Sequence, residues 1–299
     1  MNLFMNQIEQ EAILRIEKFS KIAKAMGFEI CLGFSGGKDS QVVYDLCLRA
    51  GIEFKAYFNH SFESSTTLKF IRENYQDVIK RRDYKFGFIE NIWKNHRGLL
   101  PTVQIAYCCK DYKHNPDYID KCSIVGVRKA ESARRKMRTA FEIKNNTLLK
   151  KNKTLIDDYF EENCQSTGTA SIIQLKPIID WSDDEVWSYM QKHKLPVNPE
   201  YKRRKRVGCF LCPKTNFTNN ADALIEYPKV IDAFIRAREK GSLKIDWIIT
   251  SENRDCSDDK CYYICRWLNH SFMPFTKKQE KLYEKVKAKY DSIHESRTI

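Results

Sequence analysis

Apolar positions along the first two thirds of the chain follow two periods. Short continuous apolar runs suited to buried strands occupy residues 29–34, 52–58, 122–127 and 171–175. Between and before these runs, apolar residues recur every three or four positions, as on one face of a helix, over residues 8–22, 40–50 and 68–78. Strand, helix and strand joined by short connections imply right-handed parallel crossovers. The pattern therefore predicts an α/β fold built on a parallel sheet.

The ends of several helices can also be predicted. Gly51 is placed to end the helix that begins near residue 40. A helix capped by Ser65 or Thr66 is expected to continue to the basic residues 80–82. Farther along, Ser182 and Glu185 are spaced as a capping box at the start of another helix.

Two segments depart from this alternation. Residues 145–169 are rich in Asn, Lys, Asp and Thr with little periodicity, which predicts a polar insertion or mobile loop. Residues 201–299 carry Cys256, Cys261 and Cys265, with aromatic residues around the last two. These three cysteines either fill a buried helical core, form a second metal site, or in part replace Cys108 or Cys109 as ligands of a cluster. Residues 277–290 are expected to form a charged surface helix.

Composition narrows the class of protein. The 299 residues include 52 Lys and Arg against 39 Asp and Glu, a net charge of +13 that favours polyanionic partners such as nucleic acid, nucleotide or phosphate. The sequence shows neither an apolar run of about 18 residues nor a signal-peptide pattern, so we expect a cytoplasmic protein with no membrane partner. Eleven cysteines in such a protein favour metal, cluster or redox chemistry over disulfides.

The stretch Ser35–Ser40, with sequence Ser-Gly-Gly-Lys-Asp-Ser, lies between a predicted strand and a predicted helix. Gly36 and Gly37 let the backbone approach an anion closely, and the first N–H groups of the helix would face it. The Ser35 and Ser40 hydroxyls are further donors, and Lys38 adds a point charge. A Walker A loop is excluded because the spacing is one residue short and Asp39 replaces the hydroxyl that binds magnesium. The stretch predicts a phosphate site.

These six residues resemble the signature of the PP-loop ATP pyrophosphatases, which cleave ATP between the α and β phosphates. The resemblance implies an adenine nucleotide α-hydrolase-like, Rossmann-like fold. It also implies that Ser35, Gly36, Gly37, Lys38 and Ser40 hold the leaving pyrophosphate while Mg²⁺ offsets its charge. Lys38, Asp39 and Arg128 are the expected catalytic residues. Asp39 either orients the loop or contacts Mg²⁺.

Two later stretches resemble the phosphoadenosine phosphosulfate (PAPS) reductase family. Gly126 and Arg128 begin a segment similar to that family's second phosphate-binding motif, and residues 177–187 resemble its Asp-Trp-Ser helix start. The nucleotide site is therefore expected to contain residues 35–40, Gly126 and Arg128. We expect residues 1–200 to form the PP-loop domain and residues 201–299 to form a smaller helical region that contains cysteines. His60 and Glu63 either meet the nucleotide or lie on a surface loop.

Two cysteine pairs suggest a metal site. The adjacent Cys108 and Cys109 and the Cys-x-x-Cys pair Cys209 and Cys212 resemble the cluster-binding pattern of adenosine phosphosulfate (APS) reductases, with a longer separation here. Four thiolates can hold a 4Fe–4S cluster, with zinc as the less favoured occupant, or they can remain unligated. The basic residues Arg203, Arg204 and Arg206 are expected to offset the thiolate charge.

The resemblances together imply an adenylating enzyme. The PP-loop signature is intact and the C-terminal cysteine motif of sulfonucleotide reductases is absent, so an adenylating enzyme similar to the ATP pyrophosphatases of DNA phosphorothioation fits better than a reductase. The implied reaction forms AMP and pyrophosphate from ATP and adenylates an acceptor for sulfur transfer. A sulfonucleotide reductase and a non-enzymatic accessory that binds nucleic acid are the alternatives. Expected partners are ATP, a nucleic-acid or sulfonucleotide substrate and a sulfur-donor protein, while the acceptor and the oligomeric state are left open.

Overall fold

The computed structural model describes residues 3–81, 85–113, 122–143, 150–151, 153–154, 157, 172–241, 259–269 and 275–295. The chain divides into two compact units, and each unit is made of several segments that are separated in the sequence. Unit 1 contains Met1–His60, Ser65–Arg82 and His114–Val207, and unit 2 contains Ser61–Ser64, Asp83–Lys113 and Gly208–Ile299. The two-domain division predicted at residue 200 stays a prediction, and unit 2 draws residues from both sides of it.

Unit 1 is built on a mostly parallel sheet, as the apolar runs predict. Within the described residues the strand order is β3-β2-β1-β4-β6-β5. The strands are β1 (Ile30–Phe34), β2 (Lys55–Asn59), β3 (Ile79–Arg81), β4 (Cys122–Val125), β5 (Phe141–Ile143) and β6 (Ile173–Leu175). Only β5 runs antiparallel, paired with β6. The fold is therefore α/β with a parallel core.

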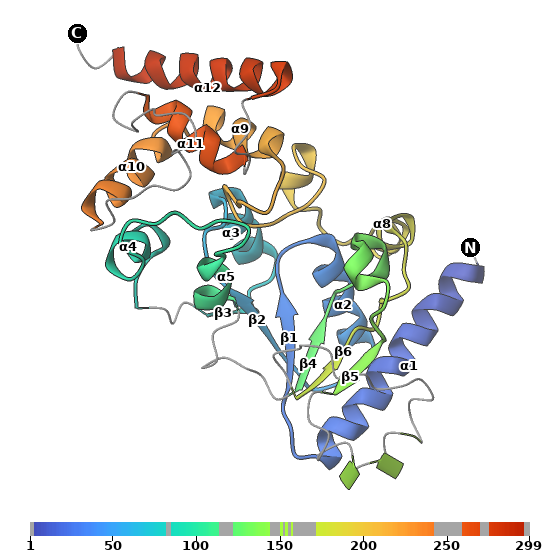
Figure 1. Ribbon diagram of the computed structural model, residues 1–299. Helices are drawn as coiled ribbons and strands as arrows, with labels where there is room; N and C mark the ends of the chain where they lie inside the picture. Colours follow the sequence, from blue (N-terminus) through green and yellow to red (C-terminus); the bar gives the residue numbers. More distant parts are fainter. Residues whose placement is uncertain are drawn as a thin grey trace. The chain divides into compact units, whose positions relative to one another are not determined.

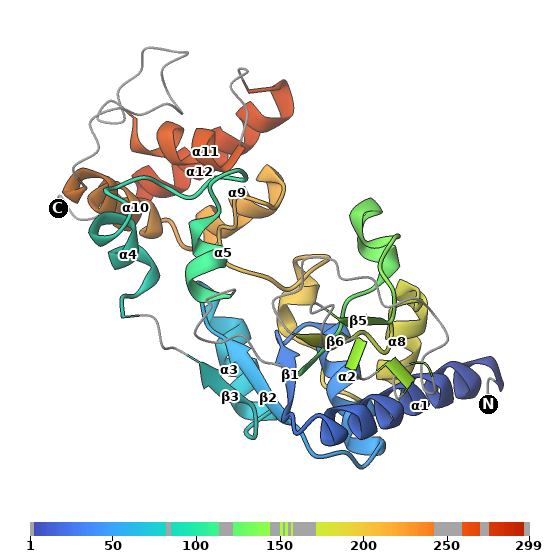
Figure 2. The ribbon, with the colours of Figure 1, turned by 60° about the horizontal axis from the view of Figure 1, so that its bottom comes forward.

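The helices of unit 1 cover this sheet and share its core (Figures 1 and 2). They are α1 (Leu3–Ala25), α2 (Lys38–Arg49), α3 (Ser65–Asn74) and α8 (Asp183–Lys192). Both α1 and α8 pack against α2, and fully buried side chains such as Ile16, Val42 and Val186 join the common core. Short 3₁₀ turns follow at Lys129–Glu131, Ala133–Arg135 and Pro199–Lys202.

One predicted boundary is wrong. The helix expected to reach residues 80–82 ends at Asn74, and Ile79–Arg81 forms the edge strand β3 beside β2. Tyr75 and Val78 are both buried, but their three-residue spacing is compatible with a helix end followed by a turn into a strand. The helix starting at Ser65, and the helix that ends before Gly51, are confirmed.

The sheet has its topological switch at β1. The chain leaves β1 through α2 and returns at β2 on one side, whereas β4 pairs with β1 on the other side. Connections that diverge in this way leave a crevice at the carboxyl ends of the two central strands, where α/β proteins bind ligands. Ser35–Gly37 and Gly126–Arg128 follow these two strand ends directly.

Unit 2 is helical and has its own apolar core. Its helices are α4 (Phe88–Lys94), α5 (Tyr107–Tyr112), α9 (Phe217–Glu226), α10 (Val230–Lys240), α11 (Lys260–Asn269) and α12 (Lys277–Glu295). Helices α9 to α12 pack together in both ribbon views (Figures 1 and 2). The predicted charged helix after residue 277 is confirmed as α12, which buries Val286.

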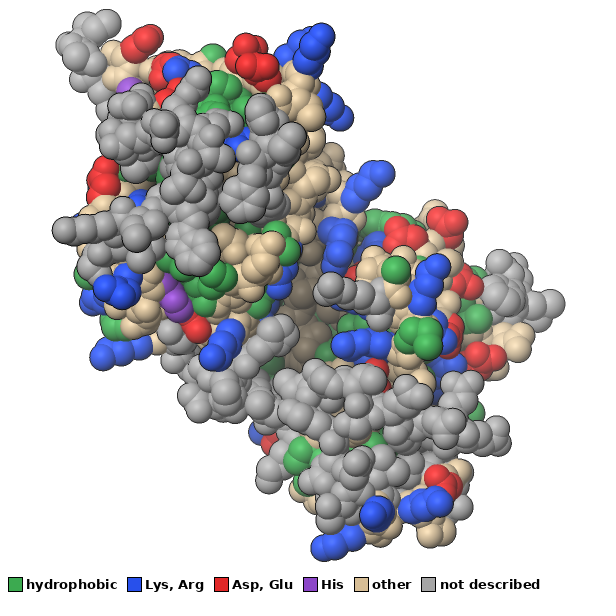
Figure 3. Space-filling model, viewed as in Figure 1, with side chains coloured by type: hydrophobic (Ala, Val, Ile, Leu, Met, Phe, Trp, Pro, Cys, Tyr) green, Lys and Arg blue, Asp and Glu red, His purple; other side chains and the backbone are tan. Residues whose placement is uncertain are grey.

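Lys and Arg side chains are distributed over both units, mixed with acidic ones, on the face drawn in Figure 3. Among the described helices, none is long and apolar enough to cross a membrane. Most of the predicted insertion at 145–169 lies outside the described residues, as does Cys256.

Candidate functional site

The Ser35–Ser40 loop is closed by its own hydroxyl groups. The Ser40 hydroxyl donates to the Gly37 carbonyl at 2.8 Å and accepts the Ser35 N–H at 3.2 Å. Gly36 has a φ of 73°, and an added Cβ there would lie 3.0 Å from Ile71. The positive φ therefore favours glycine at this turn, and a side chain there would also require Ile71 to move. The loop leads into α2, whose first turn contains Lys38 and Asp39.

Two side chains from distant sequence hold the loop in place. The Asn198 amide donates to the Gly36 carbonyl at 3.0 Å, and the Lys38 backbone N–H donates to the Tyr201 hydroxyl at 2.8 Å. Burial raises the pKa of Tyr201 to about 12, so the phenol stays protonated at neutral pH. Sequence reasoning missed both residues, because Asn198–Tyr201 has no recognisable motif of its own.

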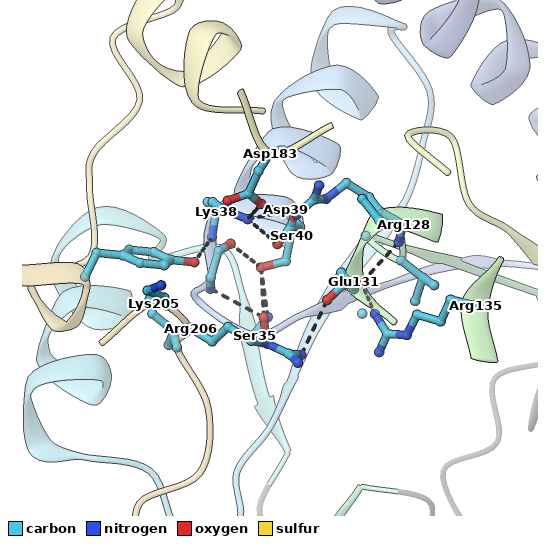
Figure 4. Close-up of a pocket in the computed structure, with 17 residues that line it drawn as sticks. Ser35, Lys38, Asp39, Ser40, Arg128, Glu131, Arg135, Asp183, Lys205 and Arg206 are labelled. Atoms are coloured by element: carbon cyan, nitrogen blue, oxygen red, sulfur yellow. Dashed lines mark hydrogen bonds and ion pairs between the residues drawn. The ribbon is translucent and has the colours of Figure 1, made fainter. Parts of the chain in front are cut away.

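A ring of alternating charges lies beside the loop (Figure 4). Lys38 Nζ contacts Asp183 Oδ1 at 2.8 Å and Asp39 Oδ2 at 3.2 Å. Arg128 bridges the same two carboxylates, with Nε 2.5 Å from Asp39 and Nη2 2.6 Å from Asp183. The Arg128 side chain is only 2% exposed and also donates to the Trp181 carbonyl. A buried guanidinium needs such compensation, because desolvating an unpaired charge is costly.

Asp183 is a site residue that sequence reasoning missed. The capping box of Ser182 and Glu185 is confirmed, with Ser182 Oγ accepting the Glu185 N–H at 3.2 Å. The cap fixes the start of α8 and so places Asp183 beside the two cations. A hydrogen bond from Lys38, followed by one from Arg128, holds the pKa of Asp183 below its usual range against the effect of burial. Its acidic first-turn position was the only signal in the sequence.

Gly126 permits the close approach of two segments. A Cβ at this position would lie 2.8 Å from the backbone carbonyl of Asp39 and 3.0 Å from the Ser40 nitrogen. Real Cβ atoms do not approach backbone atoms so closely, so only glycine lets the end of β4 pass the start of α2. This packing positions Arg128 against the first turn of α2.

These residues line a cavity of about 480 Å³ in unit 1. All the predicted nucleotide residues except Gly36 line it, namely Ser35, Gly37, Lys38, Asp39, Ser40, Gly126 and Arg128. Glu131 lies farther from the loop and pairs with both Arg135 and Arg206. Arg206, which the sequence suggested as a countercharge for thiolates, thus belongs to this cavity. Convergent donors of this kind, at a helix N-terminus, are suited to binding phosphate groups.

The second group of candidate residues lies in unit 2. Cys108 and Cys109 are on α5, and Cys209 and Cys212 flank a turn in which Leu211 has a φ of 50°. Each pair shares a hydrogen bond: Cys108 donates to Cys109, lowering the Cys109 pKa to about 5, and Cys212 donates to Cys209, lowering the Cys209 pKa as well. The pKa values of Cys108 and Cys212 are raised correspondingly.

The two thiol pairs also interact with each other. Cys209 and Cys212 each contribute to the raised pKa of Cys108 through charge repulsion, which falls off quickly with distance. The structure therefore brings all four predicted cysteines into one neighbourhood within unit 2. Among the described residues, however, no set of three or more His, Cys, Asp or Glu side chains has the arrangement that a single metal ion requires.

Two lysines supply positive charge to this neighbourhood. Lys214 Nζ lies 3.6 Å from Cys109 Sγ, and Lys113 hydrogen-bonds Cys209. Cys209 and the nearby Glu63 outweigh the effect of burial and raise the pKa of Lys113. Ser61 Oγ is 3.3 Å from Cys209 Sγ. Glu63, considered for the nucleotide site from sequence, instead lies 3.8 Å from that sulfur.

Two of the three C-terminal cysteines, Cys261 and Cys265, belong to the core, as one of the sequence interpretations held. Cys261 and Cys265 lie on α11 and are 2% and 0% exposed. Burial raises the pKa of the Cys261 thiol to about 12 and that of Cys265 well above its usual value. Neither thiol is available as a surface nucleophile.

Comparison with curated proteins finds two relatives of greater length. Two uncharacterized proteins of Methanocaldococcus jannaschii are 30% and 26% identical to this chain over 82% and 70% of its length. The aligned parts are 48% and 47% of those proteins, so the chain spans about half the length of the curated relatives it matches.

Two solved structures are also similar. Phosphoadenylyl-sulfate (PAPS) reductase from Candida auris, in a phosphate complex, has a TM-score of 0.43 at 13% identity, covering 71% of this chain and 97% of that one. The U34-tRNA thiolase NcsA from Methanococcus maripaludis, described with its 4Fe–4S cluster, has a TM-score of 0.39 at 14% identity, covering 90% of this chain and 91% of that one.

A family model provides the assignment. The model described as the phosphoadenosine phosphosulfate reductase domain matches residues 29–215, which is more than half of the chain. This range begins at β1 and includes the Ser35–Ser40 loop, Arg128, Asp183 and all four clustered cysteines. The chain therefore belongs to the phosphoadenosine phosphosulfate reductase domain family.

Proposed function

We propose that this protein cleaves ATP to AMP and pyrophosphate and transfers the adenylyl group to an acceptor, as a step in sulfur transfer. The observation that carries the proposal is the intact Ser35–Ser40 loop at the base of a cavity that contains Lys38 and Arg128. The loop hydroxyls and N–H groups would hold the leaving pyrophosphate. Electrostatic stabilisation of the departing charge and correct positioning of the acceptor would supply most of the rate.

The charge ring suggests how the site works. Asp39 and Asp183 compensate Lys38 and Arg128 when no phosphate is bound. A nucleotide phosphate carries the same charge as these carboxylates, so it can take over one or both cations. The displaced carboxylates would then be available to Mg²⁺, which is commonly bound by one or two carboxylates together with substrate phosphates. Asp39 thus both orients Arg128 and could contact the metal.

The cysteine neighbourhood supports a 4Fe–4S cluster on Cys108, Cys109, Cys209 and Cys212 within this proposal. The donor set fits, because the four thiols lie together with Lys113 and Lys214 to offset their charge. A four-iron cluster is larger than one ion, so its ligands need not converge as zinc ligands do. When bound, the cluster would supply the sulfur and redox chemistry. Zinc on the same thiols is the less favoured occupant.

The test is a product analysis on anaerobically purified protein with ATP and Mg²⁺. Pyrophosphate and AMP should appear when the correct acceptor is present, and a panel of DNA, RNA and sulfate would identify its class. ADP and inorganic phosphate as the products would contradict the proposal, because they require attack at the γ phosphorus. Binding of ATP without turnover across the whole panel would favour the non-enzymatic accessory. The similarity to the enzymes of DNA phosphorothioation stays a prediction.

Reduction of a sulfonucleotide is the alternative activity, and the family description itself favours it. That reaction needs an accessible thiolate outside the metal site, which attacks sulfur and is released by a thiol donor. Cys261 and Cys265 are too deeply buried for this role. We therefore expect no sulfite from APS or PAPS with reduced thioredoxin. If thioredoxin-dependent sulfite formed and was lost in Cys256→Ser, the function would be reduction of a sulfonucleotide rather than adenylation.

A further inference from the structure

Positive charge is concentrated in two short segments of unit 1. Residues 129–138 and 199–206 together contain ten Lys and Arg residues and two Glu residues. Their difference of eight accounts for more than half of the net charge of +13 in eighteen of the 299 residues. A charged surface segment is usually only solvated, so concentration in the sequence is not sufficient evidence for a binding surface. The positions of the two segments in the fold decide the matter.

The two segments meet at the mouth of the cavity, although about 70 residues separate them. Glu131 pairs with Arg135 of its own segment and with Arg206 of the other, whose Nη2 lies 3.4 Å away (Figure 4). Lys205 lines the same mouth. One carboxylate thus serves two guanidinium groups, and burial together with the neighbouring Arg206 and Arg138 lowers the pKa of Arg135. The mouth therefore has excess positive charge, unlike the balanced ring at the cavity base.

The outer part of this surface combines charge with an exposed apolar group. Met137 is 84% exposed, and it follows Lys136 and precedes Arg138. Lys136 and Lys202 are exposed and do not line the cavity. An apolar side chain among cations can contact a base while its neighbours bind phosphates. A single nucleotide in the cavity would not reach cations distributed over both segments, whereas a polymer with repeated phosphates would.

We propose that this basic surface, defined as Arg135, Lys136, Met137, Arg138, Lys202, Lys205 and Arg206, binds the backbone of a nucleic acid that is the acceptor substrate. The proposal rests on the adenylation activity proposed above and names its substrate class. Because the surface borders the cavity, a nucleic acid bound there presents an oxygen to the α phosphorus. That oxygen forms the new P–O bond, and the bond to the β-phosphate oxygen breaks with its electron pair leaving on pyrophosphate.

The experiment measures binding of short fluorescein-labelled RNA and DNA, single-stranded and duplex, by anisotropy over a range of salt concentrations. The test variant is Lys136→Gln with Lys202→Gln. The matched control is Lys18→Gln with Lys24→Gln on α1, whose C-terminal end leads into β1 and so lies at the amino ends of the strands, opposite the carboxyl ends that border the cavity. Both variants lose two positive charges, so they separate a local surface from net charge. ATP binding is measured on the same samples.

We expect the test variant to bind RNA or DNA about tenfold more weakly than the parent, with the slope of log K against log salt reduced by about 2. The control should bind as the parent does. Met137→Ala should weaken binding a few-fold with an unchanged salt slope, because it removes a contact without charge. ATP binding should be equal in all four proteins, which shows that the cavity remains intact.

Other results would overturn this inference. Equal affinity of the test variant and the parent would show that nucleic acid does not bind at this surface. Equal losses of affinity in the test and control variants would show that binding depends only on the net charge of the protein. If the parent bound neither RNA nor DNA but bound a sulfonucleotide tightly, the cations would instead serve to bind a small anion. A parent that cleaves ATP but binds no nucleic acid would refute this inference alone. If the parent bound nucleic acid but did not cleave ATP when that nucleic acid was present, the proposed function alone would be refuted.

Discussion

The two units bring charged groups together in different ways. In unit 1 the cations Lys38 and Arg128 are matched by the carboxylates Asp39 and Asp183, and every partner is in ion-pair contact without a ligand. In unit 2 the cysteines form two separate hydrogen-bonded pairs, and the described residues there contain no complete set of ligands for one ion. The charged groups of the cavity in unit 1 are therefore already arranged without a ligand, whereas metal binding would complete the geometry of the proposed cysteine site.

The largest effect expected from this comparison is at Lys38. Lys38→Ala removes one of the two cations that contact both carboxylates, so pyrophosphate release should fall by about a hundredfold or more. The measurement is release of pyrophosphate and AMP at saturating ATP. Lys24→Ala, an exposed lysine on α1, is the control and should retain the parent rate. Retention of activity by Lys38→Ala would show that the preorganised ring is not the catalytic site.

The next effect separates the two units. Anaerobically purified protein should contain about four iron and four labile sulfide atoms per chain, as a 4Fe–4S cluster requires. Cys109→Ser and Cys209→Ser, which affect one pair each, should lose most of this iron while retaining ATP binding. Cys261→Ser is the control, since that thiol lies in the α11 core and not with the four. Colourless protein with one zinc ion per chain would assign the site to a structural metal instead.

The same contrast explains what the sequence could predict. Ser35–Ser40 was identifiable because six contiguous residues carry the chemistry, and the four cysteines because their spacing is distinctive. Asp183 and Tyr201 contact Lys38 but lie 145 and 163 residues after it in the sequence. The local sequence around them predicts only a helix cap and a loop. Contacts of that kind depend on strand order, which local periodicity does not specify. Lys113 and Lys214 were missed as countercharges for the same reason.

The misassigned strand β3 shows a different limit. Leu68, Ile71, Tyr75 and Val78 fit a helical period, and the true helix stops at Asn74. What makes Ile79–Arg81 a strand is pairing with β2, where Phe58 aligns with Lys80. A three-residue edge strand carries too few positions for its two-residue period to be distinguished. Tertiary pairing therefore overrides the sequence pattern there.

A moderate effect should follow from unbalancing the ring. Asp183→Asn leaves Lys38 and Arg128 with Asp39 alone, so pyrophosphate release should fall by about tenfold. Because the Asp183 side chain is 64% exposed, the loss of stability should be only about 1 kcal/mol. Asp184→Asn is the control, as the neighbouring acid lies in the same first turn of α8. Equal effects of the two variants would indicate a helix-dipole role rather than a place in the ring.

The pH dependence of this difference has a defined sign. The pKa of Asp183 is lower in the folded protein, through Lys38 first, than in the unfolded chain. Its contribution to stability is therefore fully present above the unfolded value of about 3.9 and is lost as the pH falls through the folded value. Urea unfolding of parent and Asp183→Asn should differ equally at pH 6 to 8 and converge in acid. A difference that grew on acidification would contradict the ion pairs.

The last prediction tests why the charged groups of unit 1 are held in place before a ligand binds. In Gly126→Ala the new methyl group would lie 2.8 Å from the Asp39 carbonyl, so β4 and α2 must move apart. Overpacking of this kind costs about 1 to 3 kcal/mol, measured as a lower midpoint of urea unfolding. Gly87→Ala is the matched control, since a Cβ there would meet no atom within 4 Å. Because the shift also displaces Arg128 from Asp39, ATP binding should weaken in Gly126→Ala while the iron content stays at the parent level. A loss of iron with unchanged ATP binding would mean that this glycine serves the cysteine unit rather than the phosphate loop.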